Sequence, residues 1–305
     1  MKIFLPQAFF EGNFVPFSQA NISVATHALH YGTAAFGGMR AFINPENEKE
    51  VMLFRLDKHA QRLSKSAKFF GYDISPEYIA EKIIEFIKKN KPQTSIYIRP
   101  LVYTSDLDIA PRLHNVAFDF LIYGLEMGEY LSSTDGITCT ISSYQRQSDV
   151  SFPLRGKISG AYITSGLAKT EAHERGFDEA ILLNNQSKVS EGSAMNIFIV
   201  RNGKIITPGV NQDILEGITR DSVIQLAKSL GYEVEERQVD KSELFIADEV
   251  FFTGTAAKLS AVKKIEQYNL PTTRPIFDTL KSNFELLQLG KIKEFESFVT
   301  KIEIE

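Results

Sequence analysis

The sequence has a single cysteine, Cys139, and no tryptophan. One cysteine excludes an intramolecular disulfide and a zinc site built from several cysteines. The 34 basic and 38 acidic residues leave a net charge of −4, which argues against a protein that holds nucleic acid or an anionic membrane by bulk charge. The longest apolar stretch, residues 116–125, contains Asp119 and is too short to span a bilayer.

Signals for export and for metal binding are also missing. The first residues, MKIFLPQAFFEG, place Pro6 and Glu11 where a leader needs an uninterrupted apolar segment, so we expect no signal peptide and a cytoplasmic location. The five histidines form no H-E-x-x-H motif and no cluster with cysteine, and we expect no metal. The sequence contains no Walker loop, no dinucleotide G-x-G-x-x-G motif and no G-x-S-x-G elbow.

Length and composition predict two domains. A chain of 305 residues corresponds to about two domains of ordinary size. The polar stretch 126–136 is the predicted connector between them. We therefore expect a smaller N-terminal α/β domain over 1–125 and a larger mixed domain over 137–305, so that the fold class is α+β or α/β.

Apolar spacing and turn residues predict the individual elements. We expect hairpins around 11–13, 44–50 and 201–203, and a helix with Ser75 as N-cap and Pro76 at its first position. The tail, 291–304, is expected to be helical. That capped helix is predicted to run over 78–89; the other predicted helices are 56–70, 161–175, 219–230 and 276–281. The predicted strands are 95–103, 116–123, 137–144, 179–183, 196–200, 204–207, 233–237 and 249–253.

One lysine has neighbours of the type that catalysis requires. Lys157 lies between Gly156 and Gly160, after Pro153 and before a predicted helix. Small neighbours let a bulky group approach the backbone, and a desolvated lysine near other cations becomes a nucleophile. Taken alone, the segment also fits a lysine in a surface turn, which is the commoner case.

Four further motifs each fit an ordinary turn as well as a ligand site. GITRD (217–221) begins an amphipathic helix whose free amides suit a phosphate. FTGTAA (252–257) follows a strand and forms a second shape that suits an anion. In VSEGSAMN (189–196), Glu191 is placed to meet a protonated ring nitrogen. ALHYGTAAFGGMR (28–40) alternates aromatic and small residues that would form the wall of a pocket.

Together and in this order, the motifs resemble those of the fold-type IV pyridoxal-phosphate enzymes, specifically the branched-chain amino acid aminotransferases. The resemblance covers about residues 8–265 and rests on HALHYGT, YIRP, the lysine segment, SEG, GITRD and GTAA. It implies a two-domain enzyme with pyridoxal 5′-phosphate that exchanges the amino group between leucine, isoleucine or valine and 2-oxoglutarate. It also implies a homodimer or a higher homo-oligomer, with no nucleic-acid or membrane partner.

Other activities of the same fold remain open at this point. A 4-amino-4-deoxychorismate lyase and a D-amino acid transaminase share the fold, although the Tyr97 and Arg99 pair and HALHYGT favour the branched-chain enzyme. A third alternative is a relative that binds the cofactor without turnover, but the key positions are all present.

The resemblance implies roles for the cofactor residues. Lys157 would bind the cofactor covalently and move the proton during transfer. Glu191 would hold the pyridine nitrogen protonated, which keeps the ring an electron sink, and Tyr162 would bind the phenolic oxygen. The phosphate would be bound by Arg62, Ile218, Thr219 and Thr255.

The resemblance also implies substrate contacts. Tyr97 and Arg99 would recognise a carboxylate, and Arg99 the distal one of glutamate. The amides of Ala256 and Ala257 would take the α-carboxylate. The apolar pocket would be lined by Tyr31, Phe36, Gly38 and Tyr130, with Tyr31 reaching in from a neighbouring subunit. The chain departs from the family pattern at Gly37, where many relatives have glutamate, in the loop 106–114 and at Met127, which leaves the chain-length preference open.

Overall fold

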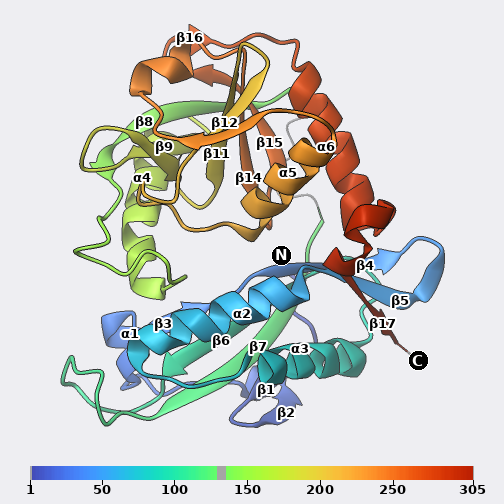
Figure 1. The fold of residues 1–305 in the computed structure, drawn as a ribbon. Helices are drawn as coiled ribbons and strands as arrows, with labels where there is room; N and C mark the ends of the chain where they lie inside the picture. The colour runs from blue at the N-terminus through green and yellow to red at the C-terminus, as the bar shows by residue number, and fades with distance from the viewer. Residues whose placement is uncertain (1, 129–134, 305) are drawn as a thin grey trace. The chain divides into compact units, whose positions relative to one another are not determined.

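The described residues of this computed structural model, 2–128 and 135–304, form two compact units (Figure 1). Unit 1 comprises Met1–Gly128, Gly156–Gly160 and Leu287–Glu305, and unit 2 comprises Glu129–Arg155 and Ala161–Leu286. Among the residues that the structure describes, no helix has both the length and the apolar character that a membrane span requires.

This division differs from the predicted one in two places. The five residues around Lys157 belong to unit 1, because Ile158 pairs with Ala35 and the Gly160 amide donates to the Gly32 carbonyl at 3.1 Å. The C-terminal residues also belong to unit 1, because strand β17 (Val299–Glu303) pairs antiparallel with β5 (Asn47–Phe54).

The predicted helical tail over 291–304 is wrong. The segment forms a 3-10 helix, η5 (Lys293–Phe298), followed by β17. Its last residues alternate, so that Ile302 and Ile304 are buried whereas Lys301 and Glu303 are exposed. This period of two suits a strand, and pairing with the edge of β5 satisfies backbone groups that would otherwise be exposed.

Unit 1 is built on an eight-stranded sheet with the order β17-β5-β4-β6-β7-β1-β2, in which β3 pairs with β6. Its pairings are antiparallel. Helices α2 (Leu56–Ala67) and α3 (Pro76–Asn90) pack on each other and on the sheet (Figure 1). The other elements are β1 (Gln7–Phe10), β2 (Asn13–Pro16), η1 (Phe17–Gln19), α1 (His27–Tyr31), β3 (Ala34–Phe36), β4 (Met39–Asn44), η2 (Lys68–Phe70), β6 (Ile96–Thr104) and β7 (Phe118–Glu126).

Unit 2 has a nine-stranded sheet with the order β10-β9-β8-β15-β14-β11-β12-β13, in which β16 pairs with β15. Strand β8 pairs parallel with β9 and β15, and β12 pairs parallel with β13. Helix α4 (Tyr162–Glu174) packs on β8 and β9, and α5 (Ile218–Ser229) packs on β13 and β14. The other elements are β8 (Ile137–Gln145), β9 (Glu179–Leu183), β10 (Val189–Gly192), β11 (Asn196–Arg201), β12 (Lys204–Pro208), β13 (Val234–Arg237), η4 (Lys241–Phe245), β14 (Glu249–Gly254), β15 (Lys258–Ile265), β16 (Tyr268–Asn269) and α6 (Pro275–Gln288). The short η3 (Ser159–Ala161) lies where the chain passes from unit 1 to unit 2.

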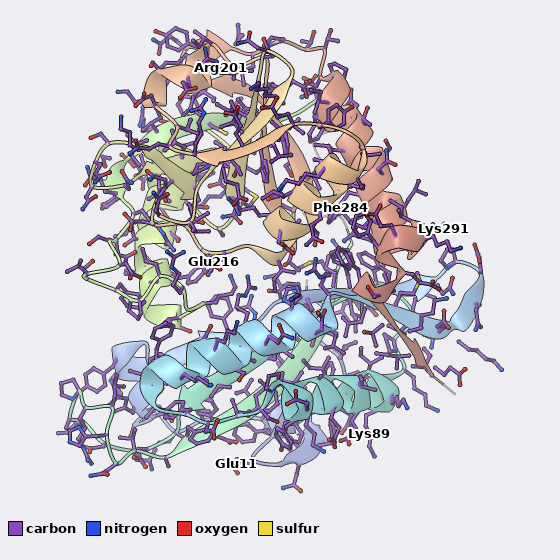
Figure 2. All side chains as sticks on the ribbon, viewed as in Figure 1. Glu11, Lys89, Arg201, Glu216, Phe284 and Lys291 are labelled. Atoms are coloured by element: carbon purple, nitrogen blue, oxygen red, sulfur yellow. The ribbon has the colours of Figure 1, made fainter. Side chains whose placement is uncertain are left out.

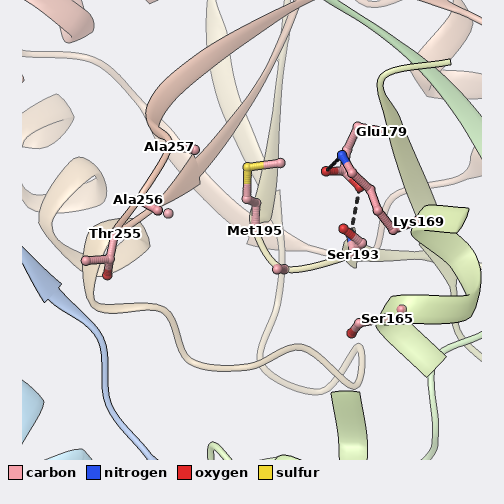
Figure 3. Close-up of a pocket in the computed structure, with 11 residues that line it drawn as sticks. Ser165, Lys169, Glu179, Ser193, Met195, Thr255, Ala256 and Ala257 are labelled. Carbon is pink, nitrogen blue, oxygen red and sulfur yellow. Dashed lines mark hydrogen bonds and ion pairs between the residues drawn. The ribbon is translucent and has the colours of Figure 1, made fainter. Parts of the chain in front are cut away.

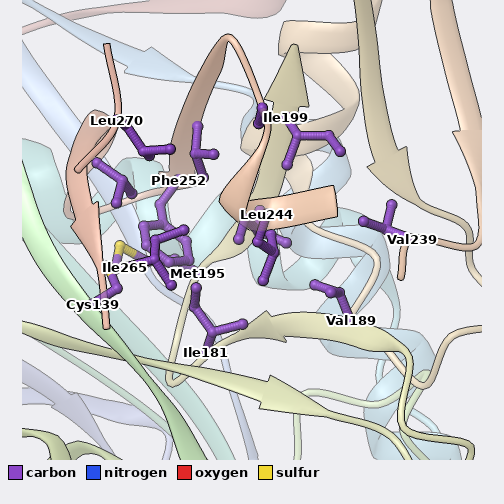
Figure 4. Packing of buried hydrophobic residues seen from close by; sticks show 14 of the residues in the cluster. Cys139, Ile181, Val189, Met195, Ile199, Val239, Leu244, Phe252, Ile265 and Leu270 are labelled. Carbon is purple, nitrogen blue, oxygen red and sulfur yellow. The ribbon is translucent and has the colours of Figure 1, made fainter. Parts of the chain in front are cut away.

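A buried apolar cluster fixes the strands of unit 2 (Figure 4). Ile197 and Ile199 of β11 pack with Phe252 of β14 and Val262 of β15, all at most 1% exposed. Cys139 of β8 is fully buried in the same cluster, and burial raises the pKa of its thiol well above the usual range. The cluster therefore holds the ends of β10 and β14, where several predicted site residues lie.

Candidate active site

The backbone of Lys157 is fixed inside unit 1. Its amide donates to the Ser66 Oγ at 3.1 Å, and its carbonyl accepts from the Phe36 amide at 3.0 Å. The side chain is half-buried, with Nζ 4.8 Å from the centroid of the Phe36 ring. Hydrogen bonds therefore fix both the amide and the carbonyl of this lysine, which does not lie in an open surface turn.

Next to this lysine, four predicted substrate residues form one continuous cluster. The Arg99 guanidinium lies 4.6 Å from the centroid of the Phe36 ring and donates through Nη2 to the Tyr97 hydroxyl at 2.8 Å. A Cβ added at Gly38 would lie 2.0 Å from that hydroxyl. The buried Arg99 Nε has no hydrogen-bond partner among the described residues. The cluster therefore combines an aromatic wall with a cation that retains a donor for an acidic group.

The departure at Gly37 has a local steric cause. A Cβ at Gly37 would lie 2.7 Å from the Cγ of Pro100, and the Gly37 amide donates to the Pro100 carbonyl at 2.8 Å. The side chain of a glutamate at this position would therefore collide with the proline ring. Position 37 is constrained by its contact with Pro100 of β6.

Arg62, on α2, belongs to a group of cations around one buried histidine. Burial, and then the charges of Arg62, Lys157 and Arg55, hold the pKa of His59 well below its usual range. His59 is 4% exposed and its Nδ1 has no hydrogen-bond partner among the described residues. A neutral histidine thus packs among three cations, an arrangement that favours an anion nearby.

Tyr31, at the end of α1, contacts the loop 106–114. Its hydroxyl donates to the Ile109 carbonyl, and the neighbouring His27 amide donates to the Asp106 carbonyl at 2.8 Å. Helix α1 is thereby joined to this loop. Tyr130, the fourth predicted pocket residue, lies outside the described residues.

In unit 2, Glu191 is a buried carboxylate with fixed orientation. It is 5% exposed and lies on β10. Its Oε1 pairs with the Arg146 Nε at 3.1 Å, and its Oε2 accepts from the Asn196 Nδ2 at 3.0 Å and from the Leu215 amide at 3.1 Å. A buried carboxylate held by an arginine and two N–H donors is pre-organised to stabilise a cation.

The N-terminus of α5 has the features of an anion site. Ile218 and Thr219 are 8% and 6% exposed, and the N-cap, Gly217, makes no side-chain cap. A Cβ at Gly217 would lie 1.9 Å from the Asn196 Oδ1, so only glycine fits against this amide. A buried helix start without a capping side chain leaves amide donors and the positive end of the dipole for a phosphate.

Thr255, Ala256 and Ala257 line a cavity of about 270 Å³ in unit 2 (Figure 3). They form the turn between β14 and β15. The opposite wall is formed by residues of α4, of which the first, Ser165, lies one turn after the half-buried Tyr162. The residues that follow β10 complete this wall. The remaining lining residues are Ser165, Gly166, Lys169, Glu179, Ser193, Ala194, Met195 and Gly254.

The structure adds residues that the sequence did not single out. Arg146 neutralises Glu191 from the end of β8, and Asn196 joins Glu191 to the start of α5. His59 lies among the cations of unit 1. The motif containing Glu191 included Asn196, but nothing local marks Arg146, whose role depends on a contact 45 positions away in sequence.

Comparisons with known proteins agree along almost the whole chain. Residues 35–265 match the protein family described as amino-transferase class IV. The chain is 61% identical over 302 residues to a probable branched-chain-amino-acid aminotransferase of Synechocystis sp., covering 99% of each. It is 36% identical over 293 residues to the branched-chain-amino-acid aminotransferase of Escherichia coli K12, covering 93% of this chain and 94% of that protein.

Solved structures share the fold. A branched-chain aminotransferase from Thermoproteus uzoniensis with norvaline matches with a TM-score of 0.93 and 34% identity, covering 99% of each chain. A T.th. branched-chain amino acid aminotransferase complexed with N-(5′-phosphopyridoxyl)-L-glutamate matches with a TM-score of 0.91 and 37% identity, covering 98% of this chain and 99% of that one.

Proposed function

The chain belongs to the class IV aminotransferase family, and from this premise we propose that it exchanges the amino group between branched-chain L-amino acids and 2-oxoglutarate. The observation that carries the proposal is Lys157, whose amine is half-buried beside the Phe36, Tyr97 and Arg99 cluster. The fold-type IV architecture and the aminotransferase class predicted from the sequence are both confirmed.

The residues fit pyridoxal 5′-phosphate. The uncapped, buried start of α5 suits the phosphate, and the fixed Glu191 carboxylate suits a protonated pyridine nitrogen. When bound, the cofactor supplies an aldehyde that accepts the amino group and a ring that withdraws electrons from the substrate's Cα–H bond.

Each protein residue then has a task that follows from its chemistry. The Lys157 amine would hold the cofactor through its aldehyde and, when free, would carry the substrate's Cα proton on Nζ. Tyr162 would donate to the phenolic oxygen. Arg62, the amides of Ile218 and Thr219, and the Thr255 hydroxyl would bind the phosphate, while the amides of Ala256 and Ala257 would hold the α-carboxylate.

One pocket must accept an aliphatic side chain and a distal carboxylate in turn. The ring of Phe36 offers an apolar wall, and Gly38 leaves room beside the Tyr97 hydroxyl. Arg99 stays bonded to Tyr97 when an aliphatic chain is present and offers its Nε when a carboxylate arrives. This arrangement avoids an isolated buried charge in either half of the reaction.

The alternatives within the fold are not favoured. The relatives described above are named as branched-chain aminotransferases, including the one with 61% identity. A 4-amino-4-deoxychorismate lyase, a D-amino acid transaminase and a non-catalytic relative therefore become outcomes of an assay. Purified protein tested in parallel with L-leucine, D-alanine and aminodeoxychorismate should convert L-leucine fastest.

The assembly is proposed to be a homodimer or a higher homo-oligomer. Unit 1 exposes an apolar patch on α1 and the loop 106–114 that includes Leu29, Leu107 and Ile109, which are 60%, 65% and 83% exposed. Exposed apolar surface of this kind marks a contact with another protein. We place Tyr31, on the same helix, against a second copy. The cytoplasmic location stays a prediction, supported by the single cysteine, which is a free thiol.

Replacement of Lys157 tests the proposal directly. Lys157→Ala should purify without the visible absorbance of covalently held cofactor, and leucine-dependent glutamate formation should fall on the order of 10³-fold or more. The control is Lys89→Ala, at an exposed position near the end of α3 (Figure 2). A Lys157→Ala protein that still holds the cofactor covalently and turns over would falsify the assignment.

A further inference from the structure

Ser165 has a buried hydroxyl with no task in the fold. The residue is 6% exposed, and its Oγ has no hydrogen-bond partner among the described residues. Most side-chain hydroxyls in the interior of a helix bond back to a carbonyl of the preceding turn or face water. Ser165 does neither, and it lines the cavity that Thr255, Ala256 and Ala257 close on the other side (Figure 3).

A glycine beside this serine gives a second observation. Gly166, in the interior of α4, destabilises a helix relative to alanine. Its backbone is not left-handed, and an added Cβ would meet nothing within 4 Å. Neither backbone conformation nor packing among the described residues requires glycine here. Gly166 is exposed and also lines the cavity, so the space that a side chain would occupy there is open to a ligand.

The charged residues of the cavity wall form an ion pair with each other. The Lys169 ammonium pairs with the Glu179 Oε2 at 2.8 Å. The Glu179 Oε1 accepts from the amides of Ala180 at 2.8 Å and Ser193 at 3.4 Å. The carboxylate is thus held by its own donors and its charge is balanced, so the wall does not repel an anion that enters the cavity.

We propose that Ser165 is a specificity-determining residue that donates its hydroxyl to the α-carboxylate of the substrate. Ser165 and Gly166 share the face of α4 that begins with Tyr162, because positions separated by three and four residues lie side by side. The carboxylate would be bound on one side by the turn amides of Ala256 and Ala257 and on the other by Ser165. The inference rests on the proposed function, because it extends the same site.

Two small probes separate the carboxylate from the rest of leucine. 4-Methylpentanoate keeps the isobutyl chain and the carboxylate but has no amine, whereas 3-methylbutylamine keeps the chain and the amine but has no carboxylate. Spectral titration of the holoenzyme should show that Ser165→Ala binds 4-methylpentanoate about 10- to 100-fold more weakly than wild type. Binding of 3-methylbutylamine should be unchanged.

Three variants control the measurement. Ser165→Thr keeps a hydroxyl and should restore most of the affinity for the acid. Thr170→Ala removes a hydroxyl from an exposed position of the same helix and should bind both probes as wild type does. Gly166→Leu places a side chain in the open space and should weaken binding of the acid.

The outcomes separate this inference from the proposed function. Unchanged affinity of Ser165→Ala for 4-methylpentanoate, or an equal loss for both probes, overturns the role of Ser165. A wild-type protein that binds the acid in a Ser165-dependent way but converts no leucine contradicts the proposed function and supports the carboxylate site.

Discussion

At the scale of single residues, the arrangement around Glu191 joins stability to chemistry. Glu191 and Arg146 bury all but 7% of their side chains, so each charge depends on the other. Removing one partner of a buried pair leaves an uncompensated charge, which costs far more than the pair itself contributes. The same carboxylate that suits a pyridine nitrogen therefore also holds Arg146, Asn196 and the start of α5 together.

We therefore expect Glu191→Ala to lower the free energy of unfolding of the apoprotein by about 3 to 5 kcal/mol. Glu191→Gln should lose less stability, because its amide fills the same space, while the rate of the half-reaction with leucine falls sharply. Urea denaturation and stopped-flow spectra measure the two effects. Glu233→Ala, which breaks an exposed pair with Lys204, should change stability by less than about 1 kcal/mol. A Glu191→Ala protein as stable as this control would contradict the argument.

The residues that the sequence identified are those with local signals. Lys157 between glycines and Glu191 before a glycine belong to short motifs that can be read directly. Arg146 and Ser165 carry no such signal, because the first acts through a partner distant in sequence and the second through a cavity formed by separate segments. The role of each site residue in catalysis stays a prediction.

At the scale of elements, a charged network joins three parts of unit 2. The Glu243 carboxylate caps η4 by accepting from the Asp240 amide at 3.0 Å. It also pairs with Arg237 of β13 at 2.8 Å and Arg201 of β11 at 2.6 Å. Arg201 is marked in Figure 2. Hydrogen bonds from Arg237, above all, lower the pKa of Glu243 from 4.5 to about 2.

Acid should weaken unit 2 through this network. Because the folded-state pKa is lowered, the stability that Glu243 contributes is fully present above its ordinary pKa of 4.5 and is lost as the pH falls through about 2. Wild type should lose about 1 kcal/mol more than Glu243→Gln between about pH 5 and pH 2, after allowance for solvent screening. Denaturant titrations at several pH values measure this difference, and parallel pH curves for both proteins would refute the assignment.

Elements with local start and stop signals were predicted from the sequence. Ser75 caps α3 and accepts from the Tyr78 amide at 3.1 Å, with Pro76 in the first turn, as the spacing indicated. The hairpin of β1 and β2 turns at Glu11 and Gly12, as predicted. Strand β17 was misread because it is stabilised by pairing with β5, which lies far away along the chain and which periodicity does not reveal. Strand β15 was missed although it forms a hairpin with β14, which the sequence did predict.

At the scale of the whole molecule, the exposed apolar residues of unit 1 are the basis of the proposed assembly. Single exposed apolar residues are normal on a protein surface. Here they lie on two segments, α1 and the loop 106–114, which are joined by a hydrogen bond of 3.0 Å between the His27 ring and the Ala110 carbonyl. These apolar side chains would stay exposed in a monomer.

Charges introduced into the patch should therefore dissociate the assembly. Leu29→Glu combined with Ile109→Glu should shift the protein to the monomer in analytical ultracentrifugation, because two carboxylates would be buried without partners. Ile246→Glu, at a position 64% exposed in unit 2, is the matched control. A wild-type protein that sediments as a monomer at all concentrations would remove the basis of this prediction.

The return of the last strand to the first sheet has a consequence for biogenesis. Strand β5 is made early, but its neighbour β17 is synthesised only after all of unit 2. During translation, the edge of β5 in the nascent N-terminal sheet therefore stays unpaired by β17 until the rest of the polypeptide has emerged. Maturation of unit 1 is in this way delayed until translation has passed unit 2, and that edge is where a chaperone would be needed most.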